Sequence, residues 1–215
     1  MPSSVLSHQA PGLVLKVMFP KKLDGTALCF GTIVPDLSVV LNWLMPFNFY
    51  GISHSFIGQL VWTLPLTIIA TIIFSKFFSS ICAEIAMLKS RFFKPLRYFG
   101  IDQWKYLKNK EFNKKFWLTA IYSALIGGMT HILLDWPSHE YVQLLYPWLV
   151  APSPGFLLYS IVDYGTITIG SFLIEANLTV YNLLWSIESI IALVISLYYL
   201  RYIKKRDLIR KWYEK

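Results

Sequence analysis

The chain has 215 residues, of which 55% are hydrophobic and 15% are charged, and its mean hydropathy is +0.50. Because a soluble domain carries about 25% charged residues, this composition argues against a soluble globular protein and favours a single integral membrane domain over residues 1–215. The net charge of +8 does not predict nucleic-acid binding, since the basic residues cluster beside apolar segments and no nucleic-acid-binding motif is present.

Two short apolar stretches, Pro11 to Phe19 and Thr26 to Val34, lie near the N-terminus. Both are shorter than the roughly 20 residues that cross a bilayer as a helix, and the Pro, Lys, Asp and Gly residues between them indicate a turn. We therefore expect a short helical hairpin, which returns the chain to its start and brings His8 close to Asp36. In the alternative, Thr26 to Met45 crosses the membrane once, and His8 lies on the opposite side.

The next apolar segment, Phe56 to Phe74, is long enough for a membrane helix, and His54 stands just before it. The segment that follows, Lys76 to Lys115, carries many Lys and Arg with aromatic residues between them. We interpret it as a basic cytoplasmic loop at the membrane interface that binds anionic lipid headgroups, with an amphipathic helix pair as one form that it could take. A surface for a protein partner or a nucleic acid is the less favoured alternative.

Phe116 to Trp136 and Tyr181 to Tyr202 are the two remaining candidates for membrane helices. The first contains a Gly-Gly pair, which allows another helix to approach closely. Between them, Tyr141 to Pro154 predicts an interfacial loop or a short half-helix, and Gly155 to Ile174 is weakly apolar. The sequence thus predicts an all-α membrane bundle with about four to six membrane-embedded helices, the N-terminal hairpin included.

The distribution of Lys and Arg predicts how these segments cross the membrane. The positive-inside rule assigns Lys76 to Lys115 and the tail from Arg201 to Lys215 to the cytoplasm. The helix that starts after His54 then runs inward, and the helix that carries His131 runs outward. We expect an integral protein of the cell membrane with these histidines on the extracytoplasmic side.

Histidine and aspartate residues occur at the ends of the apolar segments. His131 and Asp135 are four residues apart, so on a helix they share one face, and Pro137 breaks the helix and allows His139 to fold back toward them. Imidazole and carboxylate groups without thiolates suit Zn²⁺, with Mn²⁺ or Fe²⁺ as alternatives, and one or two ions could bind. The predicted metal ligands are His8, Asp36, His54, His131, Asp135 and His139.

A divalent metal at a membrane boundary suggests a class of chemistry. Such a site activates water for hydrolysis, and a phosphoester of a lipid or a lipid-linked substrate supplies anionic oxygens that bind a hard cation. We therefore expect a metal-dependent hydrolase that acts among membrane lipids. The candidate catalytic residues are Asp36, Asp135 and His139.

Two other functional classes stay open. The first is a non-enzymatic membrane protein, in which the polar cluster holds a structural metal or a hydrogen-bond network and the basic loop docks a partner or anionic lipid. The second is a transporter or an ion path, because Asp163, Glu175 and Glu188 lie in or near apolar segments.

Four segments of the sequence, SHQAP, IVPDL, ISHS and GGMTHILLDWPSHE, resemble a known pattern. They are similar to an uncharacterised multi-pass membrane family that resembles the inner-membrane-associated metal-dependent hydrolases and, more distantly, the zinc-dependent phospholipase C and P1 nuclease group. The family often has a further histidine where Phe49 stands and a second acid where Ser38 stands, and both departures favour one or two ions. The resemblance implies a hydrolase fold with metal-site positions at His8, Asp36, His54, His131 and Asp135.

Overall fold

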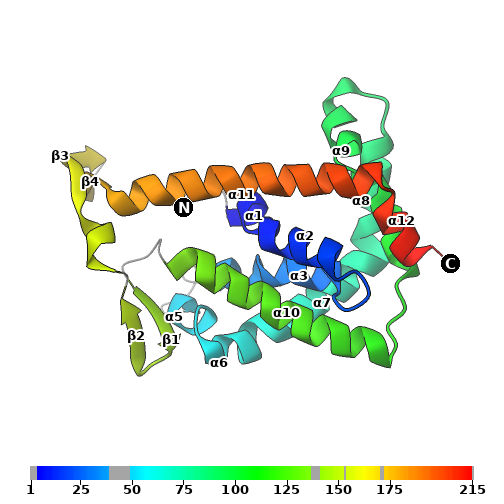
Figure 1. Ribbon diagram of the computed structural model, residues 1–215, viewed down its shortest axis with the longest axis horizontal. Coiled ribbons are helices and arrows are strands. Elements are labelled where there is room, and N and C mark those ends of the chain that lie inside the picture. The colour runs from blue at the N-terminus through cyan, green and yellow to red at the C-terminus, as the bar shows by residue number, and fades with distance from the viewer. Residues whose placement is uncertain (1–3, 39–48, 137–140, 153, 170–171, 215) are drawn as a thin grey trace.

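The computed structural model describes residues 4–38, 49–136, 141–152, 154–169 and 172–214. Helices predominate among them, and the strands pair into two small antiparallel hairpins. Figure 1 shows α10 and α11 running lengthwise through the molecule, with α2 and α3 between them and both hairpins at one end. The all-α class is therefore right for most of the described chain.

The helical segments and strands have the following bounds. The helical segments are α1 Ser4–Ser7, α2 Gln9–Met18, α3 Gly25–Gly31, η1 Val34–Asp36, α5 Phe49–Ser53, α6 Phe56–Gly58, η2 Gln59–Thr63, α7 Leu64–Ile73, η3 Phe74–Phe78, α8 Ser79–Met87, η4 Arg91–Phe93, α9 Lys94–Tyr98, η5 Ile101–Asn109, α10 Lys114–Asp135, η7 Gly155–Leu158, α11 Val180–Lys205 and α12 Leu208–Tyr213. The strands are β1 Tyr141–Leu145, β2 Leu149–Pro152, β3 Ser160–Ile169 and β4 Phe172–Thr179.

Three helices in the described residues are long and apolar enough to cross a membrane. One runs without interruption from Phe56 to Met87 over 32 residues, and the other two are α10 with 22 residues and α11 with 26, against the roughly 20 that a bilayer requires. Large apolar side chains such as Leu118 on α10 and Ile190 on α11 are more than half exposed. An outward apolar surface of this kind suits a lipid environment better than water.

The first long helix continues beyond its predicted end at Phe74. It passes through the π-helical segment η3 into α8 and ends only at Met87, so the first part of the predicted loop 76–115 is helical. The reason is local, because SSICAEIAM contains no Gly or Pro and a single charged residue. The remaining basic segment folds back through η4 and α9, and its η5 packs against α8.

The region after α10 forms two β-hairpins, which corrects the predicted loop or half-helix at Tyr141 to Pro154 and adds strands that the predicted all-α class did not include. β1 pairs with β2, and β3 pairs with β4. β3 reads SIVDYGTITI, where β-branched residues and a tyrosine favour an extended strand over a helix. Both hairpins lie at the end of the molecule where α10 finishes and α11 begins (Figure 1).

The N-terminal helical hairpin is present and packs tightly against α10. A side-chain carbon added at Gly31 would lie 2.6 Å from the Ala124 carbonyl oxygen, and one at Gly127 would lie 2.5 Å from that of Leu28. Glycine is therefore required on both sides of this helix crossing. Because α3 already ends at Gly31, the described residues disagree with the alternative of one continuous span from residue 26 to 45, whose last part lies outside them.

A buried pair of charges fixes the turn between α2 and α3 to the rest of the bundle. Lys110 Nζ lies 2.9 Å from Asp24 Oδ2, and Asp24 also caps α3 by accepting a hydrogen bond from the Ala27 N–H. The Ser123 hydroxyl accepts a hydrogen bond from the Asp24 N–H at 2.9 Å. This network holds α3 in register with α10 and so sets where the residues after α3 lie.

The long helix from Phe56 to Met87 buries a row of polar side chains. An ideal α-helix has 3.6 residues per turn, so residues spaced by four drift around its axis. The two π-helical segments η2 and η3 have more residues per turn, which compensates for that drift and keeps the row on one face. This polar row consists of Gln59, Thr63, Thr67, Thr71, Ser75 and Ser79, all at most 2% exposed.

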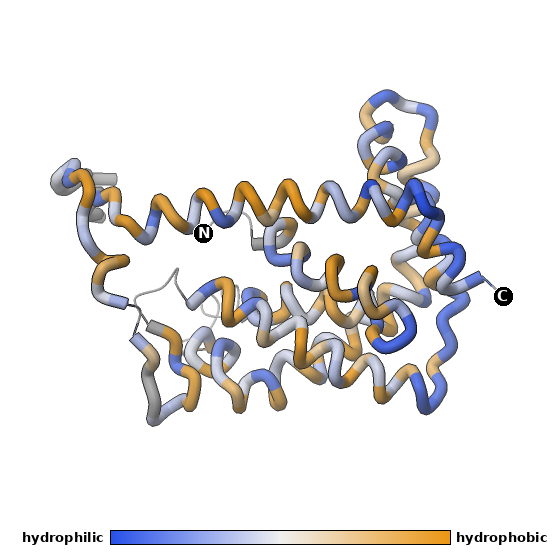
Figure 2. The backbone as a smooth tube through the Cα atoms, viewed as in Figure 1, coloured by the Kyte–Doolittle hydropathy of each residue, from blue (hydrophilic) through white to orange (hydrophobic). Residues whose placement is uncertain are grey.

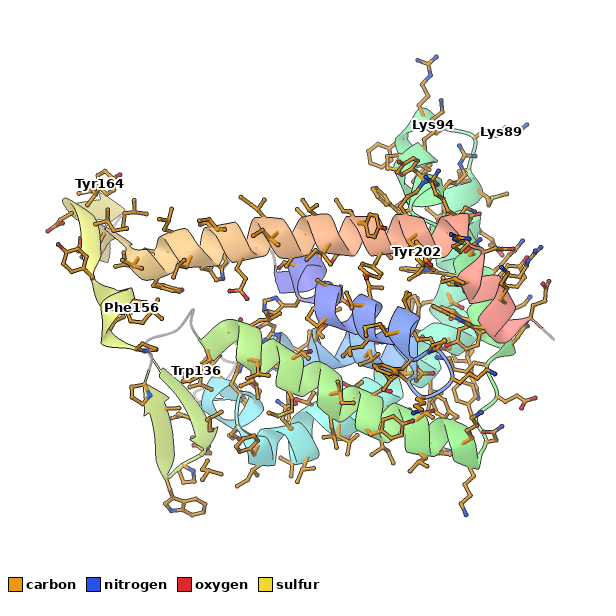
Figure 3. The ribbon with its side chains drawn as sticks, viewed as in Figure 1. Lys89, Lys94, Trp136, Phe156, Tyr164 and Tyr202 are labelled. Carbon is orange, nitrogen blue, oxygen red and sulfur yellow. The ribbon has the colours of Figure 1, made fainter. Side chains whose placement is uncertain are left out.

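The two ends of the molecule differ in character. Figure 2 shows hydrophilic residues gathered around the C-terminus, whereas the middle of α11 is hydrophobic. Lys89 and Lys94 lie at the hydrophilic end, and Trp136, Phe156 and Tyr164 lie at the other (Figure 3). The basic segment and the C-terminal tail thus share one end, and α10 finishes at the opposite end.

Candidate metal site

Four predicted ligands meet where α10 finishes. Asp36 comes from η1, His54 from the turn between α5 and α6, and His131 and Asp135 from the last turn and a half of α10. One ligand atom from each side chain lies within 4.8 Å of the other three. Three separate segments of the chain therefore contribute to a group of atoms that could hold a metal ion.

The spacing of these atoms suits direct ligands of one ion. His131 Nε2 lies 3.2 Å from His54 Nε2, 3.1 Å from Asp135 Oδ2 and 3.4 Å from Asp36 Oδ1. His54 Nε2 lies 3.5 Å from Asp135 Oδ2 and 3.9 Å from Asp36 Oδ1. In a tetrahedral site with bonds of roughly 2.1 Å, neighbouring ligand atoms are roughly 3.4 Å apart.

The backbone of residue 32 orients His131. Its Nδ1 lies 2.8 Å from the carbonyl oxygen of Thr32, and a carbonyl can only accept a hydrogen bond. His131 therefore carries its proton on Nδ1 and presents the Nε2 lone pair to the cluster. Thr32 follows α3 directly and is fully buried, so the tight α3–α10 crossing also positions this orienting carbonyl.

His54 is oriented in the same way by α5, the helix that ends just before it. Its Nδ1 lies 3.1 Å from the Tyr50 carbonyl oxygen and 2.8 Å from the hydroxyl oxygen of Ser53, and the Ser53 hydroxyl itself donates to Ser38 Oγ at 2.8 Å. The Tyr50 ring stacks on the imidazole at 4.0 Å. Burial lowers the pKa of His54 despite the neighbouring Asp135 and Asp36 carboxylates, which favours the neutral imidazole that a metal requires.

The centre of the cluster is rich in electron pairs. Two imidazole lone pairs face one another across 3.2 Å, and carboxylate oxygens of Asp36 and Asp135 face the same point. Once both Nδ1 atoms carry the protons, none of these four side chains has an N–H or O–H to place there. Either an added proton or a cation must therefore lie between them, since converging lone pairs repel one another.

His8 lies beside this group and contacts the other oxygen of the same carboxylate. Its Nε2 is 3.1 Å from Asp135 Oδ1, and its ring centroid is 4.7 Å from that of His131. Asp135 thus faces His54 and His131 with one oxygen and His8 with the other. This position allows His8 either to orient Asp135 as a ligand or to contribute to a second ion.

Access to the cluster is unequal. The side chain of Asp36 is 23% exposed, whereas those of His54 and His131 are at most 1% exposed. On the side of His8, a small cavity separates the cluster from α11 and is lined by Glu188 and Trp185. Asp36 is therefore the most exposed of these side chains.

The structure brings together Asp36, His54, His131 and Asp135 and places His8 next to them, whereas the predicted sixth ligand, His139, lies outside the described residues. The orienting carbonyls of Thr32 and Tyr50 could not be predicted, because a backbone acceptor has no signature in sequence. Ser38, which stands where the resembling family has an acid, hydrogen-bonds Ser53 behind His54.

The acids that suggested an ion path have separate surroundings. Asp163 is exposed in the β3–β4 hairpin, where it accepts a hydrogen bond from the Gly165 N–H. Glu188 lies on α11 against the small cavity beside His8, and of Glu175 only the backbone pairing with Thr166 is described. Asp163 therefore does not lie within any of the three long apolar helices.

Comparisons with known proteins identify a family to which the chain belongs. The family whose description reads "Domain of unknown function (DUF4184)" matches residues 1–207. The comparison with curated proteins finds no match, and neither does the comparison with solved structures. The matched range includes the complete cluster and all three long apolar helices.

Proposed function

The chain belongs to the DUF4184 family, a domain of unknown function, and we propose that it is a membrane-embedded, metal-dependent hydrolase of a phosphoester in a lipid or lipid-linked substrate. One observation carries the proposal. Nε2 atoms of two histidines and oxygen atoms of two carboxylates converge within 4.8 Å, and Nδ1 of each histidine is already bound to a backbone carbonyl oxygen. Such preorganised acceptors are suited to a divalent cation.

The donor set favours particular ions. Two imidazole nitrogens and two carboxylate oxygens, with no thiolate, suit Zn²⁺ best and Mn²⁺ or Fe²⁺ as alternatives. One ion fits the four converging atoms, and His8 on the outer oxygen of Asp135 is where a second ion would find ligands. A bound dication would supply a Lewis acid for phosphoester oxygens and would lower the pKa of a water molecule.

The residues of the chain would then divide the remaining work. Asp36, the most exposed ligand, is placed to accept a proton from an incoming water. Asp135, which three histidines contact, is held in place and suits a fixed ligand. The catalytic role of His139 stays a prediction.

The membrane setting supports an amphiphilic substrate. The cluster lies at the end of α10, near the end of a helix that is long and apolar enough to cross a bilayer. The positive-inside rule assigns the opposite, lysine-rich end to the cytoplasm and the cluster to the extracytoplasmic side. A lipid phosphoester at that interface reaches the site without leaving the membrane.

A second candidate, a structural metal site in a non-enzymatic membrane protein, is favoured by one feature. Four protein side chains are enough to complete a tetrahedral shell, and catalytic zinc sites keep a position open. The near-complete burial of His54 and His131 fits either candidate. The two functions differ in whether Asp36 completes a closed shell of four protein ligands or leaves one coordination position open to water or substrate.

Metal analysis of purified protein tests the shared basis of both candidates. We expect roughly one Zn²⁺ per chain in the wild type, retention in the control Asp163→Ala, and loss in His131→Ala with Asp135→Ala. Monodispersity on size exclusion shows that each variant is folded. Equal metal content in all three proteins would overturn the proposal.

Cobalt substitution then separates the hydrolase from the structural site. In an open site, inorganic phosphate replaces a ligand, and the visible spectrum of Co²⁺ changes with the coordination. We expect a saturable spectral change in the wild type. An unchanged spectrum at high phosphate would assign the site to the structural role and would remove the hydrolase.

A further inference from the structure

An apolar cavity of about 350 Å³ lies between α2, α3, η5, α11 and α12. Side chains from all five elements line it, including Leu13, Phe30, Trp104 and Ile203. Its volume is in the range of clefts that hold small molecules. The apolar lining offers few partners for water, so the cavity suits an apolar occupant.

A second cavity of about 410 Å³ adjoins the first at the lysine-rich end of the molecule. Lys16, Trp212 and Tyr213 line both cavities, so these side chains stand at the boundary between the two spaces. Lysines outnumber acids along the second cavity, and one of those acids, Asp24, is already paired with Lys110. The mouth of the apolar cavity is therefore positively charged.

Lys16 connects the two environments. Its side chain borders the apolar cavity, while its Nζ donates to the Pro20 and Leu23 carbonyl oxygens at 2.7 and 2.8 Å and lies 4.6 Å from the centre of the Trp212 ring. Burial lowers the pKa of Lys16 to about 8, so the ammonium form still prevails at pH 7. The result is a fixed cation with aromatic neighbours at the rim of an apolar space, the arrangement found at membrane interfaces.

We propose that these two neighbouring cavities together bind one anionic phospholipid, with an acyl chain in the apolar cavity and the headgroup phosphate among the lysines of the second cavity. Apolar and charged linings follow one another as they do along a lipid: Phe30 and Trp104 line the apolar cavity alone, Trp212 and Tyr213 line both cavities, and Lys21 and Lys211 line the second cavity alone. None of the four converging metal-site residues lines either cavity, so this site is independent of the proposed hydrolase.

Native mass spectrometry of the detergent-solubilised protein tests the proposal, with phosphatidylglycerol and phosphatidylcholine of the same acyl chains added separately. We expect one phosphatidylglycerol per chain to survive activation that removes other lipid, at roughly tenfold lower added concentration than phosphatidylcholine, since each lysine near a headgroup contributes a several-fold preference. Equal retention of the two lipids would overturn the anionic part of the proposal.

Two matched pairs of variants locate the lipid. Lys21→Gln with Lys211→Gln removes charge at the mouth, and Lys89→Gln with Lys94→Gln removes the same charge from an exposed segment beyond it (Figure 3). We expect roughly tenfold weaker phosphatidylglycerol retention in the first pair only. An equal decrease in both would mean unspecific attraction to anionic lipid and would remove the site.

A third matched pair of variants tests whether the acyl chain lies in the apolar cavity. Cys29 lines the apolar cavity, whereas Cys82 on α8 does not. Cys29→Phe should fill the cavity and abolish retention of both lipids, and Cys82→Phe should leave retention unchanged. Unchanged retention in Cys29→Phe, in a protein that stays monodisperse and keeps the circular dichroism spectrum of the wild type, would place the acyl chain elsewhere and overturn the proposal.

Discussion

The candidate metal site and the polar row of the first long helix are both buried and polar, yet they are built in opposite ways. In the candidate metal site, Nδ1 of each central histidine is bound to a carbonyl, and the two Nε2 atoms point at one place. In the polar row, within the described part of the chain, the hydroxyls of Thr63, Thr67 and Thr71 have no hydrogen-bond partner. Convergence and orientation, rather than burial of polar atoms, distinguish a site.

The polar row is explained by helix packing. Gln59 and Thr63 lie against Gly128 of α10, where an added side-chain carbon would meet Gln59 Oε1 and Thr63 Cγ2. Small side chains, here those of Thr, Ser and Gly, let helices approach closely in membrane proteins. Because threonine has nearly the same shape and volume as valine, it can pack in such a contact as an apolar side chain would. We therefore interpret the row as a contact surface for α3 and α10, whose function is to bring Thr32 and His131 together.

Removal of a central ligand should have the largest effect. We expect His131→Gln to abolish measurable Zn²⁺ binding, more than the roughly 10- to 100-fold loss that follows from changing a residue behind a ligand. Competition with a chromophoric chelator measures the affinity. Asp163→Asn, which alters an exposed acid in the β3–β4 hairpin, is the control, and wild-type affinity in His131→Gln would contradict the assignment.

Breaking the buried ion pair should come next. Lys110→Met leaves the Asp24 carboxylate buried and unpaired, and we expect a loss of about 3–5 kcal/mol in the free energy of unfolding at pH 7. Denaturation in detergent measures this loss. Lys115→Met, an exposed lysine, should change stability by less than about 0.5 kcal/mol.

The same pair predicts a pH dependence. Burial alone would raise the pKa of Asp24, but Lys110 and the Ala27 N–H lower it below its ordinary value. The stabilisation is therefore complete above pH ~4, the pKa of aspartate in the unfolded chain, and disappears as the pH falls through the lower folded value. We expect the difference between wild type and Lys110→Met to decrease at acid pH, and a constant difference would argue against an ionised Asp24.

Removal of the neighbouring histidine should have a smaller effect than removal of a central ligand. His8 contacts Asp135 from outside the four converging atoms, so His8→Gln should weaken metal binding by roughly 10- to 100-fold without abolishing it. The chelator competition used for His131→Gln measures this difference. Complete loss of one of two bound ions would instead show that His8 is a direct ligand.

The smallest effect is expected in the polar row. Thr67→Val keeps the shape of the side chain and removes a buried hydroxyl that has no partner among the described residues, so stability should stay within about 0.5 kcal/mol of wild type or rise. Thr67→Leu is the control for added volume and should destabilise. A loss of Zn²⁺ affinity in a stable Thr67→Val protein would show that the row has a function beyond packing.

Much of the local structure was predictable, because it depends on neighbouring residues. The long apolar helices follow from hydropathy over about 20 residues, and the four-residue spacing of His131 and Asp135 places both on one helix face. The polar row also left a signal that the sequence analysis overlooked, a polar residue at every fourth position from Gln59 to Ser79. The hairpins after α10 were missed, because a short apolar run is ambiguous between helix and strand.

The sequence by itself determined which residues could bind a metal and which helices are apolar enough for a membrane. Only the tertiary structure decided that Asp36 and His54 meet His131, because this depends on the glycine contact between α3 and α10 and on the polar row beneath them. It also decided that the Thr32 carbonyl holds the proton on Nδ1 of His131 and leaves Nε2 to the cluster. Chemical type is a property of single residues, whereas convergence is a property of packing between segments far apart in the chain.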